Sequence, residues 1–262
     1  MLNTPGFSKK FKQAVITCLF LFICNQGFCQ KINDLQLDKM TPDLEKDFAL
    51  SSLPPHLRND ATVYLLDPQK GYYIAQKGSN GFVCFVTRTE WEWGKFRKDV
   101  AAAISYDAEG ARTIFQVYKD VAAMRASGKY TALKIKDIVL NRIRKGIYKA
   151  PARPGISYML APVMRAYPGN ADNDQVITMS MPHYMFYAPY LTNKDIGGSD
   201  DGWPQVINPG ALLLGARKGP FGYIILPVGE IEKAKIINDN QELLKRLKAY
   251  NPYFSIESDS KP

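Results

Sequence analysis

The sequence predicts an α+β fold: a mainly antiparallel sheet, made of an N-terminal three-stranded meander plus C-terminal strands, covered by two or more helices. Two observations predict it. Stretches rich in β-branched and aromatic residues occur in the first and last thirds of the chain, and the segment between them repeats apolar residues at helical spacing. The 262 residues are 46% hydrophobic and 23% charged, which excludes a disordered chain and a multi-span membrane protein.

The first residues have the composition of an export signal. Three lysines precede the uncharged run Ala14–Cys24, which suits a signal peptide and is shorter than the ~20 residues of a membrane-spanning helix. Gly27 and Cys29 are small and stand at the −3 and −1 positions of a cleavage site. We therefore expect residues 1–29 to be a signal peptide, residues 30–262 to form one α+β domain with frayed ends, and the protein to be periplasmic or extracellular.

A short helix and three strands are expected next. The helix begins at Thr41-Pro42, because Thr caps free N–H groups and Pro suits the first turn, and it ends near Leu53. The strands Ala61–Asp67, Tyr72–Lys77 and Phe82–Arg88 are separated by short Gly-containing linkers typical of tight turns. We expect an antiparallel meander whose third strand is central, because both faces of that strand are apolar.

The middle of the chain is expected to be helical. Apolar residues recur at helical spacing from Ile114 to Met124 and again from Ile135 to Ile143. Expected later elements are strands at Ile156–Ala161 and His183–Ala188, a hairpin of Ala211–Ala216 with Tyr223–Val228, and a helix at Asp239–Tyr250.

Five phrases are shared with a known group of proteins. They are PPHLRNDATV (Pro54–Val63), GSNGFVC (Gly78–Cys84), YDAEG (Tyr106–Gly110), APARPGISYM (Ala150–Met159) and HYMFYAPYLTNKDIG (His183–Gly197). Together they resemble a family of exported bacterial proteins of unknown function. The resemblance implies export and a shared fold, but no activity, cofactor or catalytic residue.

The segment from His183 to Asp195 is the leading candidate for a ligand site, because rigid aromatic side chains with polar tips suit a small-ligand pocket. Two tryptophans elsewhere can stack on sugar rings or, alternatively, pack in the core. The leading hypothesis is therefore a non-catalytic module that binds a small ligand or a glycan. The expected ligand-binding residues are His183, Tyr184, Tyr187, Tyr190, Asn193, Trp91 and Trp93.

A hydrolase is the first alternative, and the sequence leaves open whether the protein is an enzyme. Cys84 is the one cysteine outside residues 1–29, so no internal disulfide is expected. It can form a thiolate–imidazole pair with His183, or it can be a small core residue. Glu90 and Glu92 share one face if their segment is a strand, and they can then act as acid and base in glycoside cleavage.

An envelope-surface interaction protein is the second alternative. Residues 129–153 carry eight basic side chains and one acid, Asp137. A helix with such a face can touch anionic lipid headgroups or acidic polysaccharide, or it can simply be solvated. Nucleic acid is not an expected partner, because no nucleic-acid-binding fold is recognisable.

No metal or cofactor is expected. The chain has two histidines and lacks Cys-x-x-Cys and His-Glu-x-x-His. The glycine-rich phosphate-binding patterns are also absent.

Overall fold

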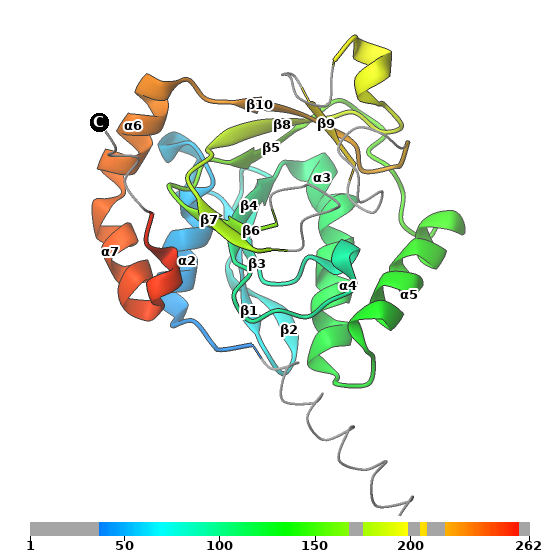
Figure 1. The fold of residues 1–262 in the computed structure, drawn as a ribbon, viewed down its shortest axis with the longest axis horizontal. Coiled ribbons are helices and arrows are strands. Elements are labelled where there is room, and N and C mark those ends of the chain that lie inside the picture. Colours follow the sequence, from blue (N-terminus) through cyan, green and yellow to red (C-terminus); the bar gives the residue numbers. More distant parts are fainter. Residues whose placement is uncertain (1–36, 168–174, 199–204, 209–217, 257–262) are drawn as a thin grey trace, which may run out of the picture.

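A sheet of eight strands runs through the middle of the molecule, in the order β2–β1–β3–β4–β5–β8–β10–β9 (Figure 1). This computed structural model describes residues 37–167, 175–198, 205–208 and 218–256, so the expected signal peptide lies outside the described residues. All described pairings in the sheet are antiparallel except that of β1 with β3. The strands are β1 (Thr62–Asp67), β2 (Gly71–Gln76), β3 (Val83–Thr87), β4 (Ala102–Tyr106), β5 (Ile156–Met159), β8 (His183–Tyr187), β9 (Gln205–Ile207) and β10 (Tyr223–Pro227), with β6 (Met164–Ala166) and β7 (Ile177–Met179) in a second, two-stranded sheet.

Helices cover both faces of this sheet, which confirms the predicted α+β fold. One apolar core lies between the sheet and α2 and α7, and a second lies between the sheet and α4 and α5 (Figure 1). In the described part of the chain, no helix has the length and apolarity that a membrane span requires. The helices are α2 (Pro42–Ser51), α3 (Ala108–Arg112), α4 (Ile114–Ala126), α5 (Ala132–Arg144), α6 (Glu230–Asp239) and α7 (Gln241–Tyr250), with 3-10 turns η1 (Pro55–Leu57), η2 (Trp91–Trp93), η3 (Asn193–Ile196) and η4 (Pro252–Phe254).

The predicted meander is wrong in its third strand. β1 and β2 form the expected antiparallel pair, but β3 lies on the other side of β1 and runs parallel to it. The linker Gly78–Gly81 between β2 and β3 crosses the start of β1, where the carbonyl of Asp60 accepts from the amides of Ser79 and Asn80. A Cβ at Gly78 would lie 2.2 Å from that carbonyl oxygen, so glycine is needed for this crossing rather than for a tight turn. β3 is buried on both faces, as expected of a central strand.

The segment around the two tryptophans is also not a strand. Trp91–Trp93 forms the 3-10 turn η2, which ends at Gly94 with φ of 62°. Glu90 and Glu92 therefore do not share one strand face opposite the indoles. β4, which follows, was not predicted, because its alanines have low β-propensity and its burial depends on neighbours on both faces.

The later predicted elements agree with the structure over most of their length. Strands occur at β5, β8 and β10, and the C-terminal helix is α7. The predicted hairpin partner Ala211–Ala216 lies outside the described residues, and the described neighbour of β10 at the sheet edge is β9. Helix α6 was not predicted and precedes α7 directly.

Candidate functional site

The residues of β8 that were expected to form one ligand site point to opposite faces of the sheet. His183 and Tyr187 face the α4 side and are buried, whereas Tyr184 faces the α2 side. The His183 ring is 2% exposed, and its Nδ1 lies 2.6 Å from the carbonyl oxygen of Met181. Burial lowers the pKa of this imidazole, so His183 is a neutral core residue.

The other expected residues after β8 are also separated from one another. Asn193 is buried, and its Oδ1 accepts from the amide of Val206 at 2.6 Å, which holds η3 against β9. Tyr190 is 56% exposed and adopts φ of 64°, a left-handed conformation that non-glycine residues rarely take. Its amide donates to the carbonyl of Gly219 at 2.7 Å, which fixes this turn.

The two indoles do not form a sugar-stacking platform. Trp91 is 3% exposed and packs in the core on the α4 side. Trp93 stacks on Tyr167, with ring centroids 4.2 Å apart and an interplanar angle of 19°. One face of the Trp93 indole is therefore already covered by protein.

The proposed thiolate–imidazole pair does not exist in this fold. Cys84 faces the α2 side of the sheet, His183 faces the α4 side, and β4 and β5 separate their strands. The Cys84 side chain is fully buried, and this burial raises the pKa of the thiol to about 12. Cys84 is a core residue.

Glu90 and Glu92 are partly buried acids whose pKa values are both raised. Burial is the main cause in each case, and it raises the pKa of Glu90 to about 8 and that of Glu92 to about 7. The charge of Glu92 raises the pKa of Glu90 further. The amide of Tyr167 donates to Oε2 of Glu90 at 3.2 Å, and this hydrogen bond lowers that pKa. Glu90 is therefore mainly protonated at neutral pH and holds Tyr167 in place.

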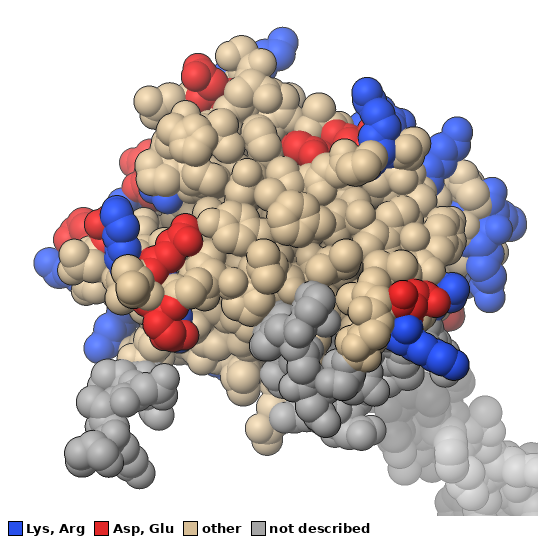
Figure 2. Space-filling view, turned by 90° about the horizontal axis from the view of Figure 1, so that it is seen from above, with Lys and Arg blue, Asp and Glu red and all other residues tan. Residues whose placement is uncertain are grey.

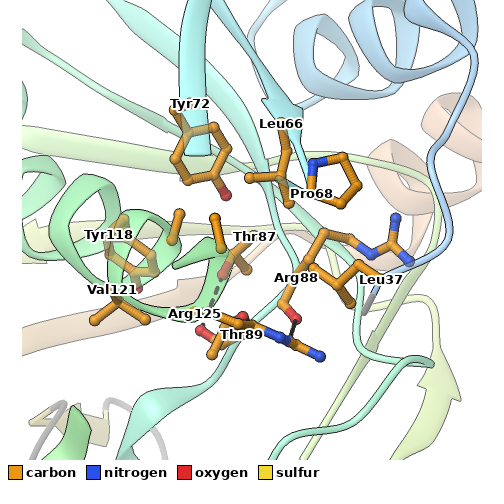
Figure 3. A pocket seen from close by; sticks show the side chains of 12 residues that line it. Leu37, Leu66, Pro68, Tyr72, Thr87, Arg88, Thr89, Tyr118, Val121 and Arg125 are labelled. Atoms are coloured by element: carbon orange, nitrogen blue, oxygen red, sulfur yellow. Dashed lines mark hydrogen bonds between the residues drawn. The ribbon is translucent and has the colours of Figure 1, made fainter. Parts of the chain in front are cut away.

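A small hollow lies between α4 and the ends of β1 and β3 (Figure 3). It offers about 10 Å³, room for roughly one water molecule. The buried guanidinium of Arg125, on its wall, donates to the carbonyl of Arg88 at 2.9 Å and to Oγ1 of Thr89 at 2.7 Å. Arg125 also lies over the Phe96 ring, 4.6 Å from its centroid. These contacts tie α4 to the segment after β3, so the hollow is a structural feature.

The best candidate for a binding site is the side of β5, β8 and β10 that faces away from α4. In-register neighbours place Tyr158 beside Tyr184 and Tyr184 beside Leu226. Two residues further along β8, Phe186 lies between Ile156 of β5 and Ile224 of β10 in the same way. We call this surface the outer aromatic face; its residues are Ile156, Tyr158, Tyr184, Phe186, Ile224 and Leu226.

The outer aromatic face is open to solvent and uncharged. Phe186 is 42% exposed and Leu226 47% exposed, and the other four side chains are partly exposed. The end of the molecule formed by α6, β10 and β8 is shown in Figure 2, where charged side chains lie mainly around an uncharged middle. Isolated exposed apolar side chains are common, but a contiguous apolar group of this kind usually marks an interaction site.

Rings continue across this face toward the start of β3. The centroid of Tyr158 lies 5.7 Å from that of Tyr184 and 5.8 Å from that of Phe82. At the rim, the Tyr184 hydroxyl donates to Oε1 of Glu232 on α6 at 3.0 Å. Burial, followed by this hydrogen bond, raises the pKa of Tyr184 to about 12, so the hydroxyl remains neutral. The face thus combines flat apolar rings with a hydrogen-bonding rim.

The face is open because the helices on this side cover the other half of the sheet. α2 packs on β1, β3 and β4, and α7 packs on α2. Only Tyr184 of the seven expected residues belongs to the outer aromatic face. The other large residues of this face, such as Tyr158 and Phe186, were not among those expected from the sequence. Tyr184 and Phe186, like Ile224 and Leu226, are two positions apart, and this spacing places each pair on one strand face.

No protein-family model, no curated protein and no solved structure matches this chain. Among the described residues, no group of three His, Cys, Asp or Glu side chains is placed to hold a metal ion. The outer aromatic face is therefore the feature from which we infer function.

Proposed function

We propose that the protein is an exported, non-catalytic binding module that holds a neutral polysaccharide on its outer aromatic face. The observation that carries this proposal is the set of in-register aromatic and aliphatic side chains that three adjacent strands leave uncovered. The lysine-rich start of the chain followed by Ala14–Cys24 supports export, as does the resemblance to exported bacterial proteins.

The chemistry of the face favours a neutral glycan over a charged ligand. None of its six side chains carries a charge, so an ionic ligand would lose hydration without gaining a partner. Sugar rings have apolar faces that pack on Tyr and Phe rings, and their hydroxyl groups need hydrogen-bond partners at the rim. Tyr184 and Glu232 supply such groups at the edge next to α6.

The geometry supports binding better than catalysis. The thiol–imidazole pair is separated by the sheet, and the two partly buried glutamates lie on the segment after β3 rather than on this face. A hydrolase at Glu90 and Glu92 stays the less favoured alternative.

Retention on insoluble polysaccharides tests the proposal. We would incubate the protein with cellulose, chitin and xylan and compare it with Phe186→Ala and Tyr184→Ala. We expect retention on at least one matrix and a loss of about tenfold or more in both variants, because stacking area is removed. Tyr73→Ala is the matched control, since Tyr73 is 42% exposed on β2.

Three results would contradict the proposal. They are the absence of retention on every matrix, equal retention of wild type and both variants, and a dimeric mass in solution that Phe186→Ala converts to a monomer. The last result would show that the outer aromatic face is an interface between copies of this chain.

A further inference from the structure

A second surface, on the opposite side of the sheet, is formed by α5 and the loop that follows it. Its basic side chains gather on the right-hand side of Figure 2, where Figure 1 places α5. Ile135 and Val139 of α5 pack inward, so the polar side of the helix faces solvent. We call this surface the cationic face; its exposed basic residues are Lys129, Lys134, Arg144, Lys145, Lys149 and Arg153.

The charge of the cationic face is largely uncompensated. Arg142, on the inner edge of α5, is neutralised by Asp120 at 2.6 Å. Arg153 has a long contact with Glu109, at 3.8 Å. Within the described residues, no ion pair involves the other five basic residues of the cationic face. Asp137 is the one exposed acid in residues 129–153.

Two large apolar side chains stand among these charges. Leu133, in the first turn of α5, is 64% exposed, and Ile147, just beyond the last turn, is 60% exposed. They lie near opposite ends of a helix about 20 Å long. Both are more exposed than Phe186 and Leu226 of the outer aromatic face.

The backbone holds Ile147 outward in a fixed position. The amide of Ile147 donates to the carbonyl of Arg142, and that of Gly146, with φ of 65°, donates to the carbonyl of Ile143. These two hydrogen bonds form a Schellman motif. In this motif the residue after the glycine commonly packs on the helix residue three or four positions before the C-cap, which here is Lys145. Here those positions are Arg142 and Asn141, so Ile147 has no apolar partner there. The buried Tyr148, which donates to Oδ2 of Asp120 at 2.7 Å, anchors the loop next to it.

We propose that the cationic face docks the protein on the surface of an anionic lipid bilayer. The basic side chains would lie against the phosphate groups of lipids, and Leu133 and Ile147 would enter the boundary between headgroups and acyl chains. An acidic polysaccharide would also attract the charge, but it offers nothing to the two apolar side chains. The outer aromatic face lies on the other side of the sheet, so a docked molecule keeps it free.

Vesicle co-sedimentation tests this docking. The exported protein would be mixed with vesicles of phosphatidylcholine alone or of three parts phosphatidylcholine and one part phosphatidylglycerol. We expect binding to the anionic vesicles that falls about tenfold when NaCl is raised from about 0.1 M to about 0.5 M. The protein is purified after export, when the expected signal peptide has been removed, because the apolar run Ala14–Cys24 would itself insert into vesicles of either composition.

The variants separate charge from apolar contact. Lys134→Glu, Lys145→Glu and Lys149→Glu together should reduce binding to anionic vesicles about tenfold or more, and Leu133→Ser with Ile147→Ser about fivefold. The matched control reverses three exposed lysines elsewhere, Lys70, Lys77 and Lys245, and should stay within about twofold of wild type. All substituted side chains are exposed, and unchanged urea unfolding curves would verify folding.

Any of three results would overturn the proposal. The first is equal binding to neutral and anionic vesicles, and the second is an equal loss of binding in the control triple variant. The third is a protein that does not bind vesicles but binds alginate, and whose alginate binding is unchanged in the Leu133→Ser, Ile147→Ser double variant.

Discussion

The hydroxyl of Tyr187 donates to Oδ1 of Asp107 at 2.8 Å, and this contact joins four elements of the fold. The same carboxylate caps α3 by accepting from the amide of Gly110 at 2.9 Å, and its Oδ2 accepts from the amide of Ile156 at 2.9 Å. β4, α3, β5 and β8 therefore meet at one side chain, that of Asp107. This explains why Tyr187, an expected ligand residue, serves the structure instead.

Removal of this hydroxyl should destabilise the protein. We expect Tyr187→Phe to lower the free energy of unfolding by about 1.5–3 kcal/mol, because a buried hydroxyl loses its hydrogen bond to the carboxylate of Asp107. Urea unfolding followed by circular dichroism measures the change. Tyr73→Phe, on the exposed edge strand β2, should change it by less than about 0.5 kcal/mol. Equal effects of the two substitutions would refute the role given to Tyr187.

Gly110 leaves the space that the Tyr187 hydroxyl occupies. A Cβ at this position would lie 2.1 Å from that oxygen, although the helical backbone of α3 otherwise suits alanine. We expect Gly110→Ala to cost about 1–3 kcal/mol in the wild-type chain. The cost should be smaller in the Tyr187→Phe background, so a double-mutant cycle should show coupling between the two sites. Strict additivity would mean that the two residues do not compete for space.

Cys84 should be unreactive in the folded protein. Its side chain is fully buried and its thiol pKa is raised to about 12, so little thiolate is present or reachable at pH 8. We expect iodoacetamide to leave the peptide containing Cys84 unmodified in buffer and to modify it fully in urea, as read by mass spectrometry. Rapid modification of the native protein would reopen the case for a reactive thiol.

Glu45 should make stability fall as pH rises. Burial raises its pKa from 4.5 to about 7, although the Leu66 amide, Arg88 and Lys39 oppose the shift. The folded protein therefore binds this proton more tightly than the unfolded chain does. Its stabilising contribution, about 3 kcal/mol, is complete below pH 4.5 and is lost as pH approaches 7.

Glu45→Gln tests this dependence. The amide oxygen of glutamine can still accept from Leu66, whose amide lies 2.8 Å from Oε1 of Glu45, and it carries no charge. We expect the variant to lose part of the decline in melting temperature between pH 5 and pH 8 and to be the more stable protein at pH 8. Glu242→Gln, on the exposed side of α7, is the control and should follow wild type. If Glu45→Gln were equally pH-dependent, another group would cause the decline.

The sequence predicts elements better than it predicts their partners. Strand propensity located β1, β2 and β3, but the linker Gly78–Gly81 suits a tight turn as well as a crossing. The crossing depends on the carbonyl of Asp60, a contact between segments that no local pattern contains. The alternation at Trp91 and Trp93 suggested a strand, yet one indole is needed in the core and the chain turns there.

The candidate site shows the same limit. The alternation in β8 correctly assigned Tyr184 and Phe186 to one face and His183 to the other. Which face stays open depends on where α2 and α7 pack, and that is decided by long-range contacts. The sequence therefore singled out a strand of the outer aromatic face, but two of the three residues expected from that strand, His183 and Tyr187, lie on its buried face.

Methyl NMR would show whether ligand binds on the outer aromatic face. Spectra of the protein labelled at Ile and Leu methyl groups would be recorded during titration with a soluble fragment of the polysaccharide that retains it. We predict shift changes at Ile156, Ile224 and Leu226 and none at Ile104, which is buried on the α4 side. Changes confined to Leu133 and Ile147 of the cationic face, or to other methyl groups, would contradict binding on the outer aromatic face.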